Sequence, residues 1–187
     1  MSEPEEFIRL RDQLKERIGG VTPGSFDSLA LEVFRFQARY NRVYADYLRF
    51  LGNVPGQVTA LHEIPFLPVS FFKKHRVMTG PETGFEQIFE SSGTTGAETS
   101  RHYISDTGLY EQLSARIFER SYGPLTGFHI LALLPSYLER NNSSLVYMVR
   151  HFMKLSGSQF SGFFLDGFEA LNRKLAAIGQ AADGRKV

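Results

Sequence analysis

Apolar residues recur at steps of three or four along the first fifty positions, and this spacing predicts amphipathic helices. One helix is predicted over residues 5–18 and ends at the pair Gly19-Gly20. A longer helix is predicted over residues 27–51, with Gly52 as its C-terminal cap. Its buried stripe consists of Leu29, Val33, Phe36, Tyr40, Val43, Tyr47 and Leu51. The pattern therefore predicts a helical N-terminal region over residues 1–58.

From residue 59 on, apolar runs of strand length alternate with stretches of helical periodicity. The run FHILALL at 128–134 is long enough for a strand that is covered on both faces. Further strands are predicted at residues 83–89, 102–104, 160–165 and 184–187, and helices at 107–121, 143–155 and 167–178. Ser105 or Asp106 is expected to cap the first of these helices. The predicted fold class is α/β: N-terminal helices followed by alternating strands and helices around a mostly parallel sheet, with residues 59–187 forming the first part of the α/β domain.

Phenylalanine is concentrated around the segment IPFLPVSFFKKHRV at residues 64–77. Its two prolines, three residues apart, prevent a regular helix through its start. Phe66, Phe71, Phe72 and the following Phe85 are candidate core residues. The wall of an acyl pocket is the functional alternative for these rings.

A run of small and hydroxylated residues, SSGTTG, occupies positions 91–96 after an apolar approach. Glycine lets the backbone come close to a phosphate, and backbone N–H groups and hydroxyls can donate to it. The run lacks the Gly-Lys-Ser/Thr ending of a Walker loop and does not open a helix as a Rossmann fingerprint does. A surface hairpin without a ligand is the alternative, but the core-like flanking segments favour a phosphate loop. Its residues are Ser91, Ser92, Gly93, Thr94, Thr95 and Gly96.

Composition and charge narrow the classes of partner. The net charge of +1 gives no reason to expect nucleic acid or a charged membrane surface as a partner. The chain has no cysteine, which excludes disulfides, thiolate metal sites and a cysteine nucleophile within these residues. The histidines have no metal-site spacing, and no apolar run approaches the roughly 18 residues that span a bilayer. The charged N-terminus is unlike a secretory signal, so we expect a soluble, cytoplasmic protein.

The SSGTTG run is similar to the phosphate loop of the adenylate-forming enzymes, which include acyl-CoA synthetases, luciferases and peptide-synthetase adenylation domains. The usual Pro-Lys-Gly continuation is absent, and AETSR stands in its place at 97–101. Three segments in order resemble the LuxE-type acyl-protein synthetases: residues 63–77, 89–103 and 131–148. The phenylacetate-CoA ligases of the PaaK type are a neighbouring group.

The resemblance implies a two-step, ATP-dependent reaction. A carboxylate, here expected to be a fatty or other apolar acid, attacks the α-phosphorus of ATP to give an acyl-adenylate and pyrophosphate. The acyl group then passes to a thiol, either of an acceptor protein or of coenzyme A. By the same resemblance, residues 91–96 hold the leaving phosphates together with Mg²⁺. Arg101 and His102 are candidate nucleotide contacts, and Tyr137, in the loop after the strand at 128–134, is a candidate for the acyl or nucleotide site.

Several parts of the family's chemistry are missing from these residues. The aromatic-Gly-x-Thr-Glu segment, the ribose aspartate, the mobile lysine and the acceptor cysteine do not occur. We therefore expect the 187 residues to be the N-terminal portion of the adenylating enzyme and to be inactive alone. An uncovered sheet edge would favour self-association of such a portion. The alternatives are a non-catalytic nucleotide-binding or scaffold module and a coenzyme A ligase of the phenylacetate type.

Overall fold

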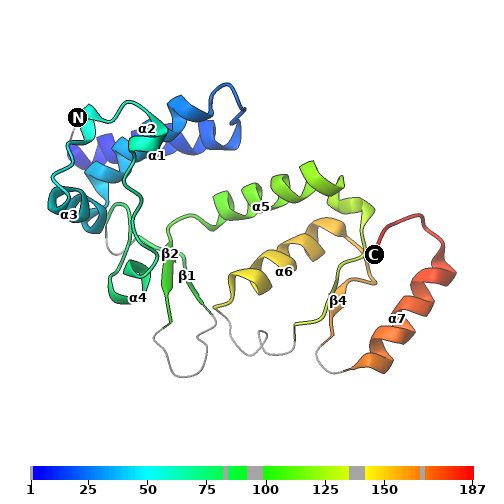
Figure 1. The fold of residues 1–187 in the computed structure, drawn as a ribbon. Helices are drawn as coiled ribbons and strands as arrows, with labels where there is room; N and C mark the ends of the chain where they lie inside the picture. The colour runs from blue at the N-terminus through cyan, green and yellow to red at the C-terminus, as the bar shows by residue number, and fades with distance from the viewer. Residues whose placement is uncertain (1, 82–83, 92–98, 135–141, 165–166) are drawn as a thin grey trace. The chain divides into compact units, whose positions relative to one another are not determined.

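The structure is a computed structural model that describes residues 2–81, 84–91, 99–134, 142–164 and 167–187. The chain divides into two compact units, Met1–Leu109 and Tyr110–Val187 (Figure 1). The boundary that the sequence predicts between residues 58 and 59 stays a prediction. Among the described residues, no helix is both long enough and apolar enough to cross a bilayer.

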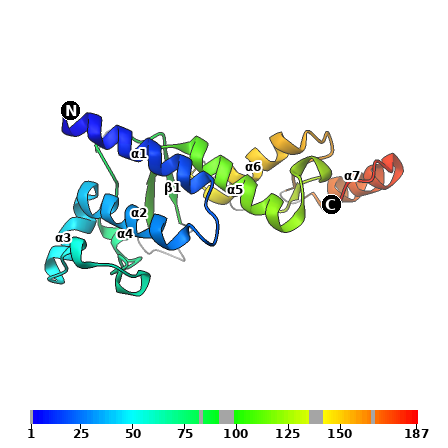
Figure 2. The same ribbon diagram turned by 90° about the horizontal axis from the view of Figure 1, so that it is seen from above.

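The first unit begins with helices and ends with a pair of strands (Figures 1 and 2). The long helices are α1 (Glu3–Gly19), α2 (Phe26–Tyr40) and α3 (Arg42–Phe50). Short helical turns follow at η1 (Pro55–Gln57), η2 (Leu61–Glu63) and α4 (Phe71–Lys74). The strands β1 (Gln87–Glu90) and β2 (Arg101–Ile104) pair antiparallel, and α5 (Thr107–Tyr122) starts just after them.

The prediction of a single helix over residues 27–51 is wrong, because the helical structure is interrupted at Asn41. Asn41 has the extended backbone angles φ −106° and ψ 104° and separates α2 from α3. Its side-chain oxygen accepts a hydrogen bond from the backbone N–H of Tyr44 at 3.1 Å, so it caps α3. Its amide group also donates to Thr79 Oγ1 at 3.3 Å. The apolar stripe continues across the break, which explains why periodicity alone predicted one helix.

The core of the first unit forms where α2 and α3 meet the segment after them. Tyr44 and Leu48 are buried there, and the Tyr44 hydroxyl donates to the carbonyl oxygen of Pro65 at 2.7 Å. Burial raises the pKa of Tyr44 to about 12, so the hydroxyl remains a donor. Other members are Phe34 and Val58, with Leu31, Ala38, Tyr47, Ile64 and Leu67 packed against them. The packing of α2 and α3 thus holds the proline-containing segment that leads to α4.

Gly80 lets α1 pack closely against the rest of the first unit. Gly80 has φ +92°, a conformation that favours glycine, and its N–H donates to the carbonyl oxygen of Tyr40 at 2.9 Å. A Cβ atom at this position would lie 2.3 Å from the ring of Phe7 in α1. Phe7 in turn stacks on Phe36 of α2, with ring centroids 5.6 Å apart.

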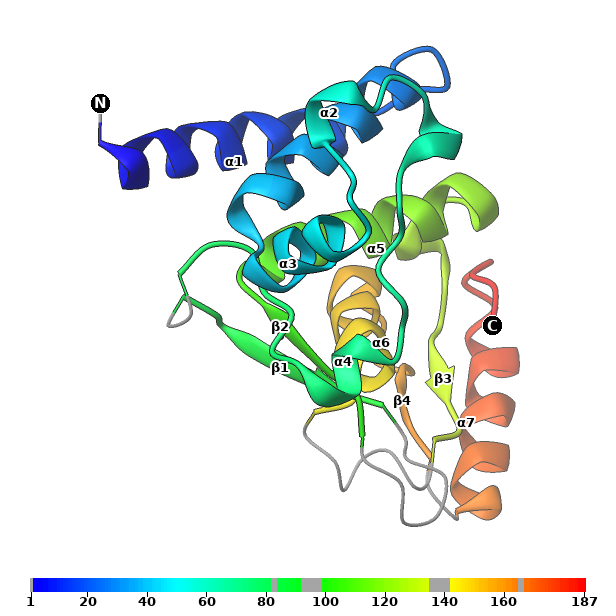
Figure 3. The same ribbon diagram turned by 60° about the vertical axis from the view of Figure 1, so that its left-hand side comes forward.

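The second unit builds a small parallel arrangement around one central strand. Its elements after α5 are η3 (Leu125–Gly127), β3 (Leu131–Ala132), α6 (Ser144–Ser156), β4 (Gly162–Phe163) and α7 (Phe168–Ala181). Strand β3 pairs in parallel with β4, and Phe128 forms a parallel bridge with Lys186 on the other side. The order of the paired segments is therefore β4, β3 and Lys186. Both β3 and β4 lie between α6 and α7 (Figure 3).

The mixed α/β class holds, but the predicted mostly parallel sheet is not present among the described residues. They form one antiparallel pair and one parallel pair, and most of the secondary structure is helical. The pair β1–β2 is antiparallel, and the ten residues between the strands, 91–100, are fewer than a parallel crossover needs. The strands predicted at 128–134 and 160–165 shorten to two-residue ladders.

A buried polar cluster joins the starts of the paired segments in the second unit. His129 is 1% exposed, and its ring nitrogens contact Ser158 Oγ at 2.6 Å and Asp183 Oδ1 at 3.1 Å. Arg185 donates from Nη1 to the carbonyl oxygen of Ser156 at 3.1 Å. His129 precedes β3, the two serines lie between α6 and β4 or at the end of α6, and Asp183 and Arg185 follow α7. Their hydrogen bonds therefore join β3, β4 and the final segment.

We predict that Asn41→Ala lowers the free energy of unfolding by about 1 kcal/mol, since the cap of α3 is lost. Asn41→Ser keeps a side-chain acceptor and serves as the matched control, with a smaller loss. Urea unfolding followed by circular dichroism measures both. Equal loss in the two variants would show that the cap at Tyr44 N–H is not the reason for the helix break.

Asp183 makes stability depend on pH. The backbone N–H of Arg185 and then the ring of His129 hold the pKa of Asp183 below its usual range. A lowered carboxyl pKa contributes stability above the unfolded pKa, and that contribution is lost as the pH falls through the folded pKa. Asp183→Asn should therefore lower the urea midpoint most near neutral pH, and the difference from the natural chain should shrink below about pH 4. Glu169→Gln, at a side chain that is 92% exposed on α7, is the control. A difference of constant size at every pH would refute the assignment.

Candidate functional site

The β1–β2 hairpin carries the SSGTTG loop. The register pairs Phe89 with His102 and Glu90 with Arg101, so these four residues stand at the loop end of the two strands. Phe89 is 4% exposed and anchors the hairpin in the first unit. The loop residues Ser92, Gly93, Thr94, Thr95 and Gly96 lie outside the described residues.

Two serines close the base of this loop. The backbone N–H of Ser91 donates to the carbonyl oxygen of Ser100 at 3.0 Å. The Ser91 hydroxyl oxygen accepts from the backbone N–H of Ser100, also at 3.0 Å. Ser100 is buried, whereas Ser91 is exposed. Of the residues predicted for phosphate binding, Ser91 is thus placed at the mouth of the loop, with its hydroxyl proton still available to donate.

Arg101 is paired with its neighbour across the strands. Its Nε lies 3.0 Å from Glu90 Oε1, and the two side chains are 59% and 33% exposed. The pair neutralises much of the positive charge that the sequence suggested for this position. Exposed pairs of this kind contribute about 0–1 kcal/mol, so a phosphate group can compete with Glu90 for the guanidinium.

His102 is stacked rather than charged. Its ring lies parallel to that of Phe72 in α4, with centroids 4.4 Å apart and planes 12° apart. Partial burial lowers the pKa of His102 below its ordinary value. The neutral ring is therefore favoured near pH 7, and His102 acts as a flat surface or a hydrogen-bonding group there rather than as a cation.

A basic run next to β2 was not among the residues selected from the sequence. Lys73, Lys74, His75 and Arg76 are exposed, and they follow Phe72 at α4, which packs against β2. The guanidinium of Arg76 lies 5.2 Å from the ring centre of Phe85 and 4.9 Å from that of Tyr103. The signal in the sequence is the four consecutive basic residues at 73–76.

The phenylalanines of this segment differ in burial. Phe66 is 77% exposed, so its prediction as a core residue is wrong. Phe71 is half-buried and packs edge-on against Tyr47 at 5.5 Å, and Phe85 packs edge-on against Tyr103 at 5.4 Å. The prolines leave Phe66 in an irregular segment without a helical or strand face to bury it.

The loop that contains Tyr137 lies outside the described residues, but both of its ends are placed. It leaves the carboxyl end of β3, the strand with a parallel partner on each side, and enters α6. Ser143 caps α6 by accepting from the backbone N–H of Val146 at 3.3 Å. Because β4 lies on one side of the β3 segment and Lys186 on the other, the strand order changes direction at β3. In open α/β sheets, ligands bind outside the carboxyl ends of strands at such a change. The structure thus brings Ser91, Arg101 and His102 together on the hairpin and leaves the position of Tyr137 a prediction.

The described residues contain no group of three or more His, Cys, Asp or Glu side chains that could hold a metal ion.

We predict that Phe72→Ala raises the pKa of His102 toward the ordinary histidine value of about 6.5, because the ring loses its cover. Titration of the His102 ring protons by NMR measures the shift. Phe66→Ala, which removes an exposed ring, is the matched control and should leave the titration unchanged. An unaltered curve in Phe72→Ala would contradict the stacking as the source of the lowered pKa.

Comparison with known proteins gives one partial likeness. A stretch of 71 residues is 34% identical to the long-chain-fatty-acid–luciferin-component ligase of Photorhabdus luminescens. This stretch is 38% of the chain and 60% of that relative's length. No model of a protein family matches the chain, and no solved structure matches it. The chain is thus similar, over part of its length, to a protein named as a fatty-acid ligase.

Proposed function

We propose that the chain is the N-terminal portion of an ATP-dependent ligase that activates a carboxylic acid, with the β1–β2 hairpin as its phosphate-binding element. The observation that carries the proposal is the SSGTTG loop on a hairpin whose base is closed by Ser91 and Ser100. The partial likeness to a fatty-acid ligase supports an apolar acid as the substrate.

The hairpin suits the charge that develops in such a reaction. When the carboxylate attacks the α-phosphorus of ATP, the bond to the bridging oxygen breaks and negative charge moves onto the leaving pyrophosphate. Donors that are already oriented stabilise this charge without reorganisation. The two hydrogen bonds between Ser91 and Ser100 join the residues on either side of the proposed phosphate donors.

Positive charge near the phosphates comes in this proposal chiefly from the basic run after Phe72. Arg101 is paired with Glu90, and His102 favours its neutral form. Lys73 and Lys74 are exposed on α4, which packs against β2, and their flexible side chains can follow the phosphates. Mg²⁺ would supply further charge compensation when bound with the nucleotide.

The acyl acceptor is a protein thiol in our proposal, with coenzyme A as the second candidate. The chain contains no cysteine, so an acceptor thiol within the enzyme must come from residues other than these. Neither the loop nor the partial relative separates the two acceptors. We propose that the 187 residues bind the nucleotide but do not complete the reaction alone.

We predict that replacing Thr94 and Thr95 together by alanine weakens MgATP binding at least tenfold. Hydrogen bonds to charged groups contribute about 1.5–3 kcal/mol each, and two hydroxyl donors are removed. Isothermal titration calorimetry measures the dissociation constant. Thr126→Ala, at an exposed threonine in η3, is the matched control and should bind as the natural chain does.

Two further measurements sharpen this test. Replacing Lys73 and Lys74 together by glutamine should also weaken MgATP binding, and should reduce its dependence on salt. In a longer polypeptide that includes these residues, ATP–pyrophosphate exchange that requires a fatty acid would support the proposed ligase activity. Nucleotide binding without any such exchange there would favour the non-catalytic module, and unchanged MgATP affinity in the Thr94/Thr95 variant would refute the phosphate loop.

A further inference from the structure

Large apolar side chains are exposed along one stretch of the first unit. Phe50 is 87% exposed at the end of α3, and Val69 is 76% exposed just before α4. The exposed set in this stretch is Phe50, Leu51, Val54, Phe66 and Val69. Elsewhere in the described part of this unit, the large apolar residues that are exposed are Ile8 and Phe26. Exposed apolar residues that gather in one region mark an interaction surface, whereas scattered ones do not.

α3 packs against the segment that leads into α4, which joins the exposed residues of both. The Tyr44 hydroxyl donates to the carbonyl oxygen of Pro65 at 2.7 Å. The ring of Tyr47 packs edge-on against Phe71 at 5.5 Å, so α3 and α4 lie side by side (Figure 2). Leu51 lies one helical turn beyond Tyr47, since its N–H donates to the Tyr47 carbonyl oxygen at 3.1 Å. The exposed residues on both sides of this contact form one surface, which we call the α3–α4 face.

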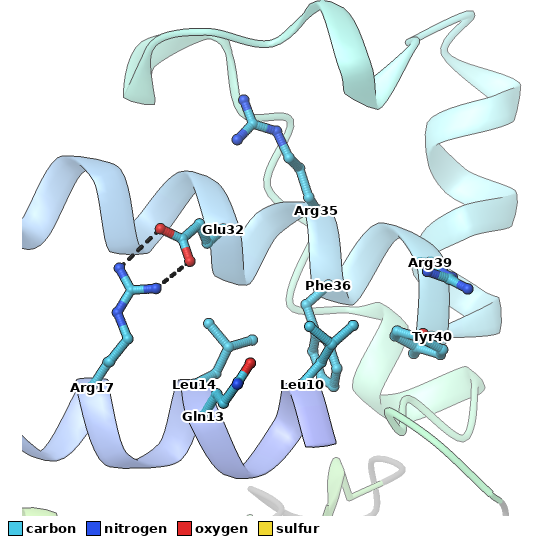
Figure 4. Close-up of a pocket in the computed structure, with 9 residues that line it drawn as sticks. All are labelled: Leu10, Gln13, Leu14, Arg17, Glu32, Arg35, Phe36, Arg39 and Tyr40. Carbon is cyan, nitrogen blue, oxygen red and sulfur yellow. Dashed lines mark hydrogen bonds and ion pairs between the residues drawn. The ribbon is translucent and has the colours of Figure 1, made fainter. Parts of the chain in front are cut away.

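The connection from α3 to η1, which carries Val54, is anchored to α2. Arg35 extends from α2 on the side away from α1 (Figure 4). Its Nη2 donates to the carbonyl oxygen of Val58 at 3.1 Å, and Val58 is buried in the core of the unit. The exposed apolar residues are therefore attached to ordered core segments, and a partner would meet a surface that is already formed.

Positive charge is concentrated on the same part of the chain. Residues 41–80 contain five Lys or Arg against two Asp or Glu, a net charge of +3, whereas the whole chain has a net charge of only +1. Lys73 and Lys74 of α4 are exposed. By contrast, Arg17 of α1 is paired with Glu32 of α2 inside the unit (Figure 4). The small net charge of the whole chain thus averages over a basic region at the α3–α4 face.

Exposed apolar residues mixed with lysines favour a lipid surface over a protein as the partner. The centres of protein–protein interfaces are depleted in charged residues, and lysine is among the residues that these interfaces contain least. A membrane surface accepts both kinds of side chain. Apolar groups enter the boundary between headgroups and acyl chains, while lysine and arginine stay at the headgroups. Anionic phospholipids attract basic segments that lie within a Debye length of the surface.

We propose that the α3–α4 face binds the surface of a bilayer that contains anionic phospholipids. Phe50, Phe66 and Val69 enter the headgroup boundary, and Lys73 and Lys74 contact the phosphate groups of the lipids. The contact is peripheral and involves no spanning helix. The inference goes beyond the proposed function, because it needs neither a nucleotide nor the SSGTTG loop.

Sedimentation with vesicles tests the α3–α4 face. We expect the chain to bind vesicles of phosphatidylcholine and phosphatidylglycerol in equal parts, and the binding to weaken as salt is added. Replacing Phe50 and Phe66 together by serine should weaken the binding by about tenfold or more, because two apolar side chains no longer leave water. Phe168→Ser, at a side chain that is 73% exposed on α7, is the matched control and should bind as the natural chain does. Circular dichroism checks that each variant is folded.

A single tryptophan gives a second, local measurement. The chain contains no tryptophan, so an introduced one reports only on its own surroundings. In Phe50→Trp, the fluorescence emission should shift to shorter wavelength when anionic vesicles are added, because the indole ring enters the headgroup boundary. Phe168→Trp should show no such shift.

The outcomes that would overturn this inference differ from those that concern the phosphate loop. No binding to anionic vesicles, equal binding to vesicles of phosphatidylcholine alone, or equal weakening by Phe168→Ser would each contradict it. A dimer that forms in place of vesicle binding, and is lost in the Phe50/Phe66 variant, would assign the α3–α4 face to a second copy of the chain instead. The Thr94/Thr95 variant should bind vesicles normally and the Phe50/Phe66 variant should bind MgATP normally, so either proposal can fail alone.

Discussion

The backbone pairing of Ser91 with Ser100 is the constraint on which the candidate site depends. Ser91 and Ser100 stand at the two ends of the stretch that contains the SSGTTG run. The antiparallel register of β1 and β2 and the burial of Phe89 fix those ends in the first unit. The Ser91 side chain adds a further hydrogen bond at the same point. The chemistry assigned to the loop therefore rests on a short ladder rather than on a large sheet.

Both units use buried polar groups to position segments that have few regular backbone hydrogen bonds. In the first unit, Asn41 caps α3 and the Tyr44 hydroxyl holds the proline-containing segment before α4. In the second unit, His129 connects Ser158 with Asp183. Each group is costly to bury unless it is satisfied, so each favours one arrangement of its neighbours over others.

The charges of the first unit follow a common pattern. Two arginines of this unit are engaged with carboxylates, Arg101 with Glu90 and Arg39 with Glu6. These pairs are partly exposed and weak, so they can exchange an internal carboxylate for a ligand's anionic group.

The sequence by itself determined the helices with strong periodicity, a cap for α5 at Ser105 or Asp106, and the location of the hydroxyl-rich run between two strands, and the structure selects Asp106 as the cap. These depend on neighbours along the chain, which a local pattern records. Only the tertiary structure decided the break at Asn41, because an unbroken apolar stripe fits one helix or two equally well. It also decided the antiparallel pairing of the hairpin, the neutral stacking of His102 on Phe72, and the exposure of Phe66. Those features depend on residues far apart in the chain, and the free energy of burial and pairing is set only when they meet.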